Sequence, residues 1–289
     1  MSWRTVVIEK ACKVSYKNNY LLIHNDDVKK IFMDEIGIVI MTNTQVNVTG
    51  VALCEMSKRK IKVIMCDEKY NPYGELVSYY GSHNTSKKLR LQTLWDDETK
   101  GTVFTHIIDA KIFNQASLLQ ELGFEEQSAA LNEYRQQLQF YDETNREGHA
   151  AKVYFNALFG KSFSRDTACN INSALDYGYS ILLSLVNREV VKNGCVTQLG
   201  IKHCNEFNQF NLSCDLMEPY RVLIDRYVYE NRNRDFDKDM KYGLVDVLNQ
   251  RIVLDRETFV SNAVATSVKS CIDSLNTKDT TKLKLYYMV

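Results

Sequence analysis

The chain has 289 residues, of which 45% are hydrophobic and 25% are charged, and its 36 lysines and arginines balance its 36 aspartates and glutamates. This is the composition of a folded globular protein with room for two modest domains. No stretch reaches the roughly 18 apolar residues of a transmembrane helix, and the polar N-terminus is unlike a signal peptide, so we expect a cytoplasmic protein without membrane contact. A net charge of zero also argues against a free-standing nucleic-acid binder, which usually carries a basic excess.

The eight cysteines include no Cys-x-x-Cys pair. That spacing argues against a zinc ribbon and against a redox dithiol. In a cytosol we expect the cysteines to be reduced and to pack as small apolar groups.

The first eighty residues contain short β-branched runs separated by Asn, Asp or Gly, a pattern that predicts strands. The predicted strands cover 5–8, 13–16, 20–23, 36–41 and 61–65, and a helix is predicted over 49–57. Asn18 and Asn19 suit a tight turn because asparagine tolerates positive φ. The Asn-Pro-Tyr-Gly sequence at 71–74 fits a type I turn.

A run of small polar residues at 81–86 predicts a linker, because domain boundaries fall in such stretches. Apolar residues recur at helical spacing beyond it. The predicted helices cover 87–94, 99–122, 125–140, 146–159, 169–192, 215–230, 238–248 and 259–275. The sequence therefore predicts an α+β fold of two domains, a small β-strand-rich domain over 1–80 and a larger, mainly α-helical domain over 87–289.

An imidazole and two carboxylates lie within a short stretch, at His203, Asp215 and Glu218. Nitrogen and carboxylate donors suit a hard divalent cation if one more carboxylate joins them, and Glu147 is the candidate. A second interpretation needs no metal: Asp215 and Glu218 match a capping box ahead of Pro219, and Glu147 suits the first turn of a helix. Spacing alone leaves both interpretations open.

Three motifs carry a resemblance to a known family. Glu-Gly-His-Ala-Ala-Lys-Val-Tyr-Phe at 147–155, Leu-Gly-Ile-Lys-His at 199–203 and Asn-Leu-Ser-Cys-Asp-Leu-Met-Glu-Pro-Tyr-Arg at 211–221 resemble those of the CRISPR-associated spacer-acquisition integrase. The stretches 66–74 and 172–179 are similar to the type II branch, which travels with a single-protein effector nuclease. The similarity covers nearly the whole chain, in order.

The resemblance implies that Glu147, His203 and Glu218 are catalytic metal ligands for Mg²⁺ or Mn²⁺, with Asp215 as a supporting acid. Many relatives have aspartate where this chain has Glu218. The implied activity joins 3′-hydroxyl ends of captured foreign DNA to the leader-proximal repeat by transesterification, and nicks DNA when water attacks instead. The same site would thus act as integrase and endonuclease in antiviral defence.

The resemblance also implies partners. They are the protospacer duplex and the CRISPR repeat, a second copy of the chain in a homodimer, and a small ferredoxin-fold companion that the 1–80 domain would contact. The type II effector nuclease and a further adaptation protein are added candidates. Local basic clusters exist, but the residues that contact DNA are not indicated. The alternatives are a non-catalytic DNA-binding scaffold subunit and a metal-dependent hydrolase of small phosphoesters.

Overall fold

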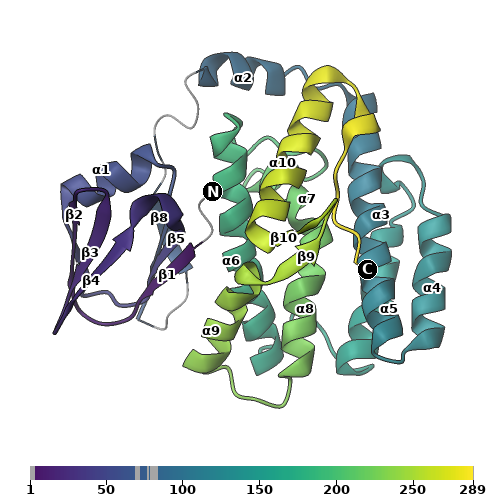
Figure 1. Cartoon of the computed structure of the whole chain (residues 1–289). Helices are drawn as coiled ribbons and strands as arrows, with labels where there is room; N and C mark the ends of the chain where they lie inside the picture. The colour runs from purple at the N-terminus through teal and green to yellow at the C-terminus, as the bar shows by residue number, and fades with distance from the viewer. Residues whose placement is uncertain (1–3, 69–71, 77, 79–83, 289) are drawn as a thin grey trace. The chain divides into compact units, whose positions relative to one another are not determined.

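The computed structural model describes residues 4–68, 72–76, 78 and 84–288. The chain divides into two compact units, residues 1–83 and 84–289, with the sheets of four strands in the first and mainly helices in the second (Figure 1). The expected α+β class, a β-rich N-terminal part before a mainly helical part, is confirmed. Of the expected linker at 81–86, residues 81–83 lie outside the described part of the chain, whereas Thr85 and Ser86 begin helix α2 (Thr85–Gln92).

Over its described residues, the N-terminal unit contains two four-stranded sheets and one α-helix, α1 (Gly50–Lys58). The first sheet has the order β1 (Arg4–Ile8), β5 (Ile36–Met41), β7 (Lys62–Cys66), β8 (Pro72–Leu76), with β5 parallel to both neighbours and β8 antiparallel to β7. The second has the order β4 (Val28–Phe32), β3 (Tyr20–His24), β2 (Lys13–Lys17), β6 (Asn47–Val48). A short 3₁₀ turn, η1 (Met33–Glu35), joins β4 to β5.

Burial in this unit follows the position of each strand in its sheet. Strand β5 is central and every one of its residues is buried, as expected for a parallel strand covered on both faces. Asn18 and Asn19 take positive φ values of 49° and 66° between β2 and β3, so the predicted turn is confirmed.

Two expectations for this unit fail. The exposed, lysine-containing strand β4 was missed, because an edge strand shows little apolar alternation. The type I turn at 71–74 is wrong for its described residues, since strand β8 begins at Pro72. Asn71 lies outside the described residues. Proline is compatible with the first position of such a strand, where no amide donor is needed.

The second unit is built on two long helices, α3 (Asp97–Glu121) and α6 (Asn170–Lys192). Its other elements are α4 (Glu125–Gln136), η2 (Phe140–Asp142), α5 (Arg146–Phe159), α7 (Asn211–Met217), η3 (Glu218–Tyr220), α8 (Arg221–Glu230), α9 (Lys238–Asp246), η4 (Val247–Asn249), the hairpin β9 (Arg251–Val253) and β10 (Glu257–Phe259), α10 (Val260–Thr277) and η5 (Thr280–Lys282). Helix α3 packs on α4, α5 and α10, and α6 packs on α7 to α10 (Figure 1).

The central position of α3 explains its composition. It is buried along most of its length, including Val103, Ile107 and Ile112 at 0% exposure, because helices surround it. Asn114 on this helix donates to the backbone oxygens of Pro219 at 2.8 Å and Tyr286 at 3.0 Å. Helix α3 is thereby joined to η3 and to the C-terminal segment, so it can present side chains to both.

The prediction of one continuous helix over 215–230 is wrong. Helix α7 begins at Asn211, four residues early, and a 3₁₀ turn containing Pro219 separates it from α8. Pro219 lacks an amide hydrogen and breaks the continuous helical pattern at this point. Asp215 therefore lies inside a helix, and the capping-box interpretation is wrong. None of the helices in the described ranges has the length and apolar character needed to cross a membrane.

Candidate metal centre

Asp215 organises the loop that carries His203. Its side chain is completely buried, and both carboxylate oxygens accept hydrogen bonds from the loop. Oδ2 accepts from the amides of Ile201 at 2.6 Å and Lys202 at 3.1 Å, whereas Oδ1 accepts from the His203 amide at 3.2 Å and from Nδ1 at 2.6 Å. A Cβ at Gly200 would lie 2.3 Å from the His203 carbonyl oxygen and 2.9 Å from Oδ2, so the loop closes around the carboxylate only with glycine there.

This arrangement sets the state of the His203 ring. A carboxylate can only accept, so Nδ1 carries the hydrogen and Nε2 presents its lone pair. The hydrogen bond that Nδ1 donates to Asp215 raises the pKa of His203 and outweighs the opposing effect of burial, and the charges of Glu218 and Glu147 add to the rise. His203 is therefore a nitrogen donor held in one orientation, with its side chain 43% exposed.

Glu147 and Glu218 meet at one ammonium group. Lys111, on the buried helix α3, contacts Glu147 Oε1 with its Nζ and lies 2.6 Å from Glu218 Oε2. Arg221 Nη2 lies 3.0 Å from the other oxygen, Glu218 Oε1. Asp142 caps α5 and so positions Glu147, because its carboxylate accepts from the Arg146 amide at 2.7 Å and from the Glu147 amide at 3.1 Å.

The charges of this cluster stabilise one another. Burial alone would raise the pKa of Glu218, but Arg221 and Lys111 outweigh it and hold the pKa below its usual range. Burial alone would lower the pKa of Lys111, but Glu218 and Glu147 outweigh it and raise the pKa. The Glu218 carboxylate and the Lys111 ammonium therefore each stabilise the charged form of the other.

The residues fit a hard divalent cation in chemical type. Glu147 and Glu218 supply oxygens and His203 supplies a nitrogen, which is a donor set that Mg²⁺ and Mn²⁺ accept. Glu218 Oε2 has no well-aligned hydrogen bond within the described part of the chain, although the Lys111 ammonium lies close to it. Among the described residues, no group of three or more His, Cys, Asp or Glu side chains is already close enough together to hold a metal ion. At this centre, the Lys111 ammonium lies between the two glutamates.

A buried tyrosine pair supports the elements that carry the two glutamates. Asp225 accepts hydrogen bonds from the hydroxyls of Tyr154, at 3.0 Å, and Tyr179. Tyr154 follows Glu147 by seven residues and Asp225 follows Glu218 by seven, so this bond links α5 to α8 two turns beyond each glutamate. Burial raises the pKa of Asp225 to about 6, against the effect of the two hydroxyl donors.

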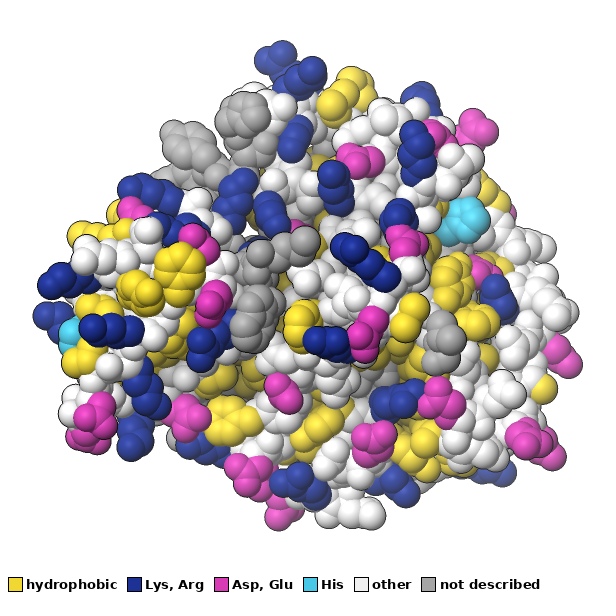
Figure 2. Space-filling model, in the orientation of Figure 1, with side chains coloured by type: hydrophobic (Ala, Val, Ile, Leu, Met, Phe, Trp, Pro, Cys, Tyr) yellow, Lys and Arg dark blue, Asp and Glu magenta, His cyan; other side chains and the backbone are white. Residues whose placement is uncertain are grey.

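An open groove of about 880 Å³ borders His203. Its walls are residues of the segment 198–211 together with Trp95, Lys100 at the start of α3 and Tyr141 in η2. The Lys202 ammonium lies 4.3 Å from the centre of the Tyr141 ring. On the face shown in Figure 2, lysine and arginine side chains are interspersed with aspartate and glutamate rather than gathered into one basic surface. The groove thus offers aromatic, amide and cationic contacts beside the candidate centre.

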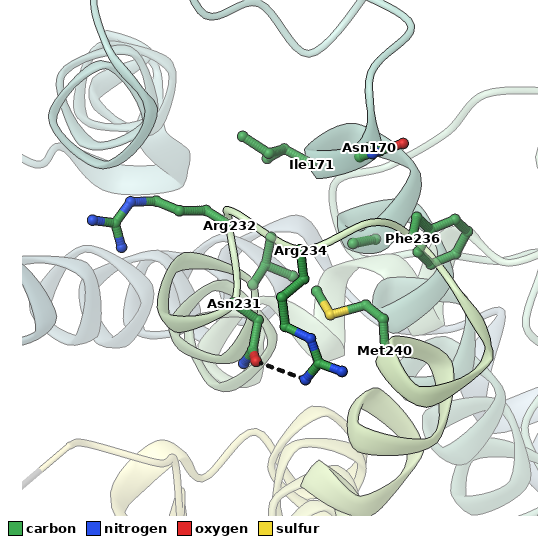
Figure 3. A pocket seen from close by; sticks show the side chains of 9 residues that line it. Asn170, Ile171, Asn231, Arg232, Arg234, Phe236 and Met240 are labelled. Carbon is green, nitrogen blue, oxygen red and sulfur yellow. Dashed lines mark hydrogen bonds between the residues drawn. The ribbon is translucent and has the colours of Figure 1, made fainter.

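A second hollow holds little. It lies between Asn170 at the start of α6 and the segment after α8, where Arg234 donates to Asn231 Oδ1 at 3.3 Å (Figure 3). Its volume of about 10 Å³ is that of roughly one water molecule. It is therefore no site for an organic ligand.

The comparisons with known proteins agree with one another. The model of the family described as CRISPR associated protein Cas1 matches residues 5–256. A CRISPR-associated endonuclease Cas1 from Neisseria meningitidis serogroup C is 30% identical over 292 residues, covering 99% of this chain and 96% of the relative. The chain belongs to the Cas1 family.

Solved structures share the fold of this Cas1-family chain. A Cas1 protein from Thermotoga maritima has a TM-score of 0.75 at 14% identity, covering 94% of this chain and 97% of the other. A Cas6-RT-Cas1–Cas2 complex has a TM-score of 0.75 at 19% identity, covering 99% of this chain and 36% of that one. A casposase bound to integration product has a TM-score of 0.73 at 17% identity, covering 96% and 92%.

Several residues of the Cas1 candidate centre gave no signal in the sequence. Lys111 occupies a helix of mixed polarity, 36 positions before Glu147 in the chain. Asp142 lies between the helices predicted over 125–140 and 146–159, and Asp225 lies in a run of charged and apolar residues. Only Arg221 stood in a recognised motif, at its last position. A buried polar residue within an apolar helical face would have been the one usable signal.

Proposed function

We propose that this Cas1-family chain is a metal-dependent DNA integrase and endonuclease of CRISPR adaptation, with Glu147, His203 and Glu218 as catalytic metal ligands and Asp215 as the supporting acid. The observation that carries the proposal is the convergence of Glu147 and Glu218 on the Lys111 ammonium, together with a histidine whose Nδ1 is bound to Asp215, which leaves Nε2 as its free ring nitrogen. Mg²⁺ or Mn²⁺, when bound, would polarise a phosphoryl oxygen and lower the pKa of the attacking 3′-hydroxyl.

The residues of the chain divide the remaining work. Glu147 and Glu218 would supply oxygen ligands and His203 a nitrogen, and Asp215 orients the imidazole by binding its Nδ1, which leaves Nε2 for the ion. Arg221 fixes the second oxygen of Glu218. Lys100 and Lys202, on the wall of the groove beside His203, suit contacts with the phosphates of a DNA strand, and the partly exposed Tyr141 suits stacking with a base.

The substrates and partners follow from the family. The 3′-hydroxyl ends of a captured DNA duplex would attack the leader-proximal repeat by transesterification, and water would replace them in the nicking reaction. A small companion of the Cas2 kind is proposed because a Cas6-RT-Cas1–Cas2 complex shares the fold, and a homodimer is proposed from the family resemblance. We assign the dimer and companion contacts to the 1–80 domain, and the type II branch on the similarity to the Neisseria protein. Assembly with the effector nuclease and a further adaptation protein, in the prokaryotic cytoplasm, belongs to the same proposal.

The test is joining of a labelled duplex to a supercoiled repeat-containing plasmid, with companion protein and Mn²⁺ or Mg²⁺. Glu147→Gln, His203→Ala and Glu218→Gln are each expected to lower the joining rate at least about 100-fold, because each removes a metal ligand. Glu133→Gln, on the exposed face of α4, is the matched control and should join normally. Undiminished joining by any of the three variants would exclude its residue as a ligand.

A non-catalytic DNA-binding scaffold is the second candidate. It is favoured by the pairing of Glu147 with Lys111 and of Glu218 with Lys111 and Arg221, since paired acids need no metal. DNA binding that is unaffected by EDTA and by Glu147→Gln, with no joining by the wild-type protein, would support the scaffold.

A further inference from the structure

Lys111 is the shared cationic partner of the two glutamates. Its ammonium group contacts Glu147 Oε1 and lies 2.6 Å from Glu218 Oε2, while its side chain is 10% exposed. Arg221 pairs with Glu218 only, through the other oxygen. Among the ion pairs of the described residues, Lys111 is therefore the cation that links Glu147 to Glu218.

Two neighbouring carboxylates repel each other, and the buried one, Glu218 at 3% exposure against 27% for Glu147, also loses its hydration. The free energy of such a pair is unfavourable unless a cation lies between them. A metal ion can supply that charge, but the chain must also fold and persist before it binds metal. Lys111 supplies a single positive charge at the required place, from the rigid helix α3.

We propose that Lys111 is a built-in counter-cation, which holds Glu147 and Glu218 together in the metal-free protein and withdraws its ammonium group from them when a divalent cation binds. The inference rests on the proposed function in naming a divalent cation as the competitor. Lysine suits this role better than arginine would, because its charge is compact and its four-carbon stem is flexible.

The competition follows from charge. With Lys111, Glu147, Glu218 and Arg221 all ionised, the metal-free cluster has no net charge, so a divalent ion must enter beside two existing cations. Without Lys111 the cluster has one net negative charge, and the ion meets one cation fewer. Removal of the ammonium group should therefore strengthen metal binding and weaken the metal-free fold.

The experiment measures Mn²⁺ affinity by isothermal titration calorimetry on the full chain, and the melting temperature in EDTA and in saturating Mn²⁺. Lys111→Met removes the charge at similar length, Lys111→Gln keeps a hydrogen-bond donor, and Lys111→Arg keeps the charge. Lys192→Met is the matched control, since Lys192 pairs with the buried Glu189 at 3.2 Å outside the centre.

We expect Lys111→Met and Lys111→Gln to bind Mn²⁺ at least about tenfold more tightly than the wild type, to melt at lower temperature in EDTA, and to regain the difference in Mn²⁺. Lys111→Arg, which keeps the charge, should bind no more tightly than the wild type, and Lys192→Met should bind as the wild type does. In EDTA, the fall in melting temperature that Lys111→Met causes should be smaller in the Glu147→Gln background, because a single carboxylate needs the ammonium less.

The outcomes separate this inference from the proposed function. If neither Lys111→Met nor Lys111→Gln binds Mn²⁺ more tightly than the wild type, the counter-cation alone is overturned. The same holds if Glu147→Gln leaves unchanged the fall in melting temperature that Lys111→Met causes in EDTA. Tighter binding by the neutral variants with no DNA joining by the wild type supports the counter-cation and overturns the integrase. Absence of Mn²⁺ binding in the wild type and both neutral variants overturns both.

Discussion

Asp215→Asn tests the link between loop geometry and the His203 tautomer. The wild-type carboxylate accepts four hydrogen bonds, two at each oxygen. Asparagine keeps one acceptor oxygen, which can retain the bonds from Ile201 and Lys202. Its amide group then faces the His203 amide and Nδ1, so two bonds to a carboxylate are lost, at about 1.5 kcal/mol each or more. The expected loss in the free energy of unfolding is about 3 kcal/mol, a large part of the 5–15 kcal/mol typical of a protein.

The substitution also changes the tautomer of the His203 ring. An amide NH₂ donates to Nδ1, which moves the hydrogen to Nε2 and removes the lone pair that faces the metal centre. Mn²⁺ affinity is expected to fall on the order of 10- to 100-fold, which is the usual effect of removing a residue that hydrogen-bonds and orients a metal ligand. Urea unfolding in EDTA measures the stability, and calorimetric titration with Mn²⁺ measures the affinity.

The pH dependence supplies an independent readout. The pKa of His203 is raised in the folded protein, so its contribution to stability is complete below the unfolded value near 6.5 and is lost as pH rises through the folded pKa. Asp215→Asn removes the main cause of the shift and should flatten this decline. Asp273→Asn, on the exposed face of α10, is the control. Unchanged stability together with unchanged Mn²⁺ affinity in Asp215→Asn would refute the reasoning.

Two further predictions concern the surroundings of the centre. Gly200→Ala should lower the melting temperature and the Mn²⁺ affinity, because its Cβ would collide with the His203 carbonyl and the Asp215 carboxylate. Gly50→Ala, with open space around it, should change neither, so equal melting temperatures of the two variants would contradict the prediction. The Asp225 pKa of about 6 lies above the unfolded value, so burial of this carboxyl costs stability as pH rises from about 4 to 6, by about 3 kcal/mol in total. Asp225→Asn should abolish that decline in urea unfolding at pH 4.5 and 7.5, and parallel pH profiles of variant and wild type would count against the assignment.

Local pattern was enough for much of the fold. The Asn18–Asn19 turn, the apolar strand β5 and the long helices α3 and α6 follow from residue preferences that act over a few positions. Predictions failed where a neighbour far along the chain decides the outcome. Asp215 has the sequence of a helix cap, yet its carboxylate binds the amides of a loop more than ten residues upstream.

The sequence by itself determined which donor types are available and, through its motifs, which family the chain resembles: Glu147, His203, Asp215 and Glu218 are readable from residue type and spacing. Only the tertiary structure decided how those groups are paired. Lys111 reaches both glutamates because α3 packs beside α5 and η3, and Asp225 meets Tyr154 because α8 packs where α5 can reach it. Charge pairing depends on distance in space, which falls to hydrogen-bond length only after distant helices have packed, and no local rule of sequence contains that distance.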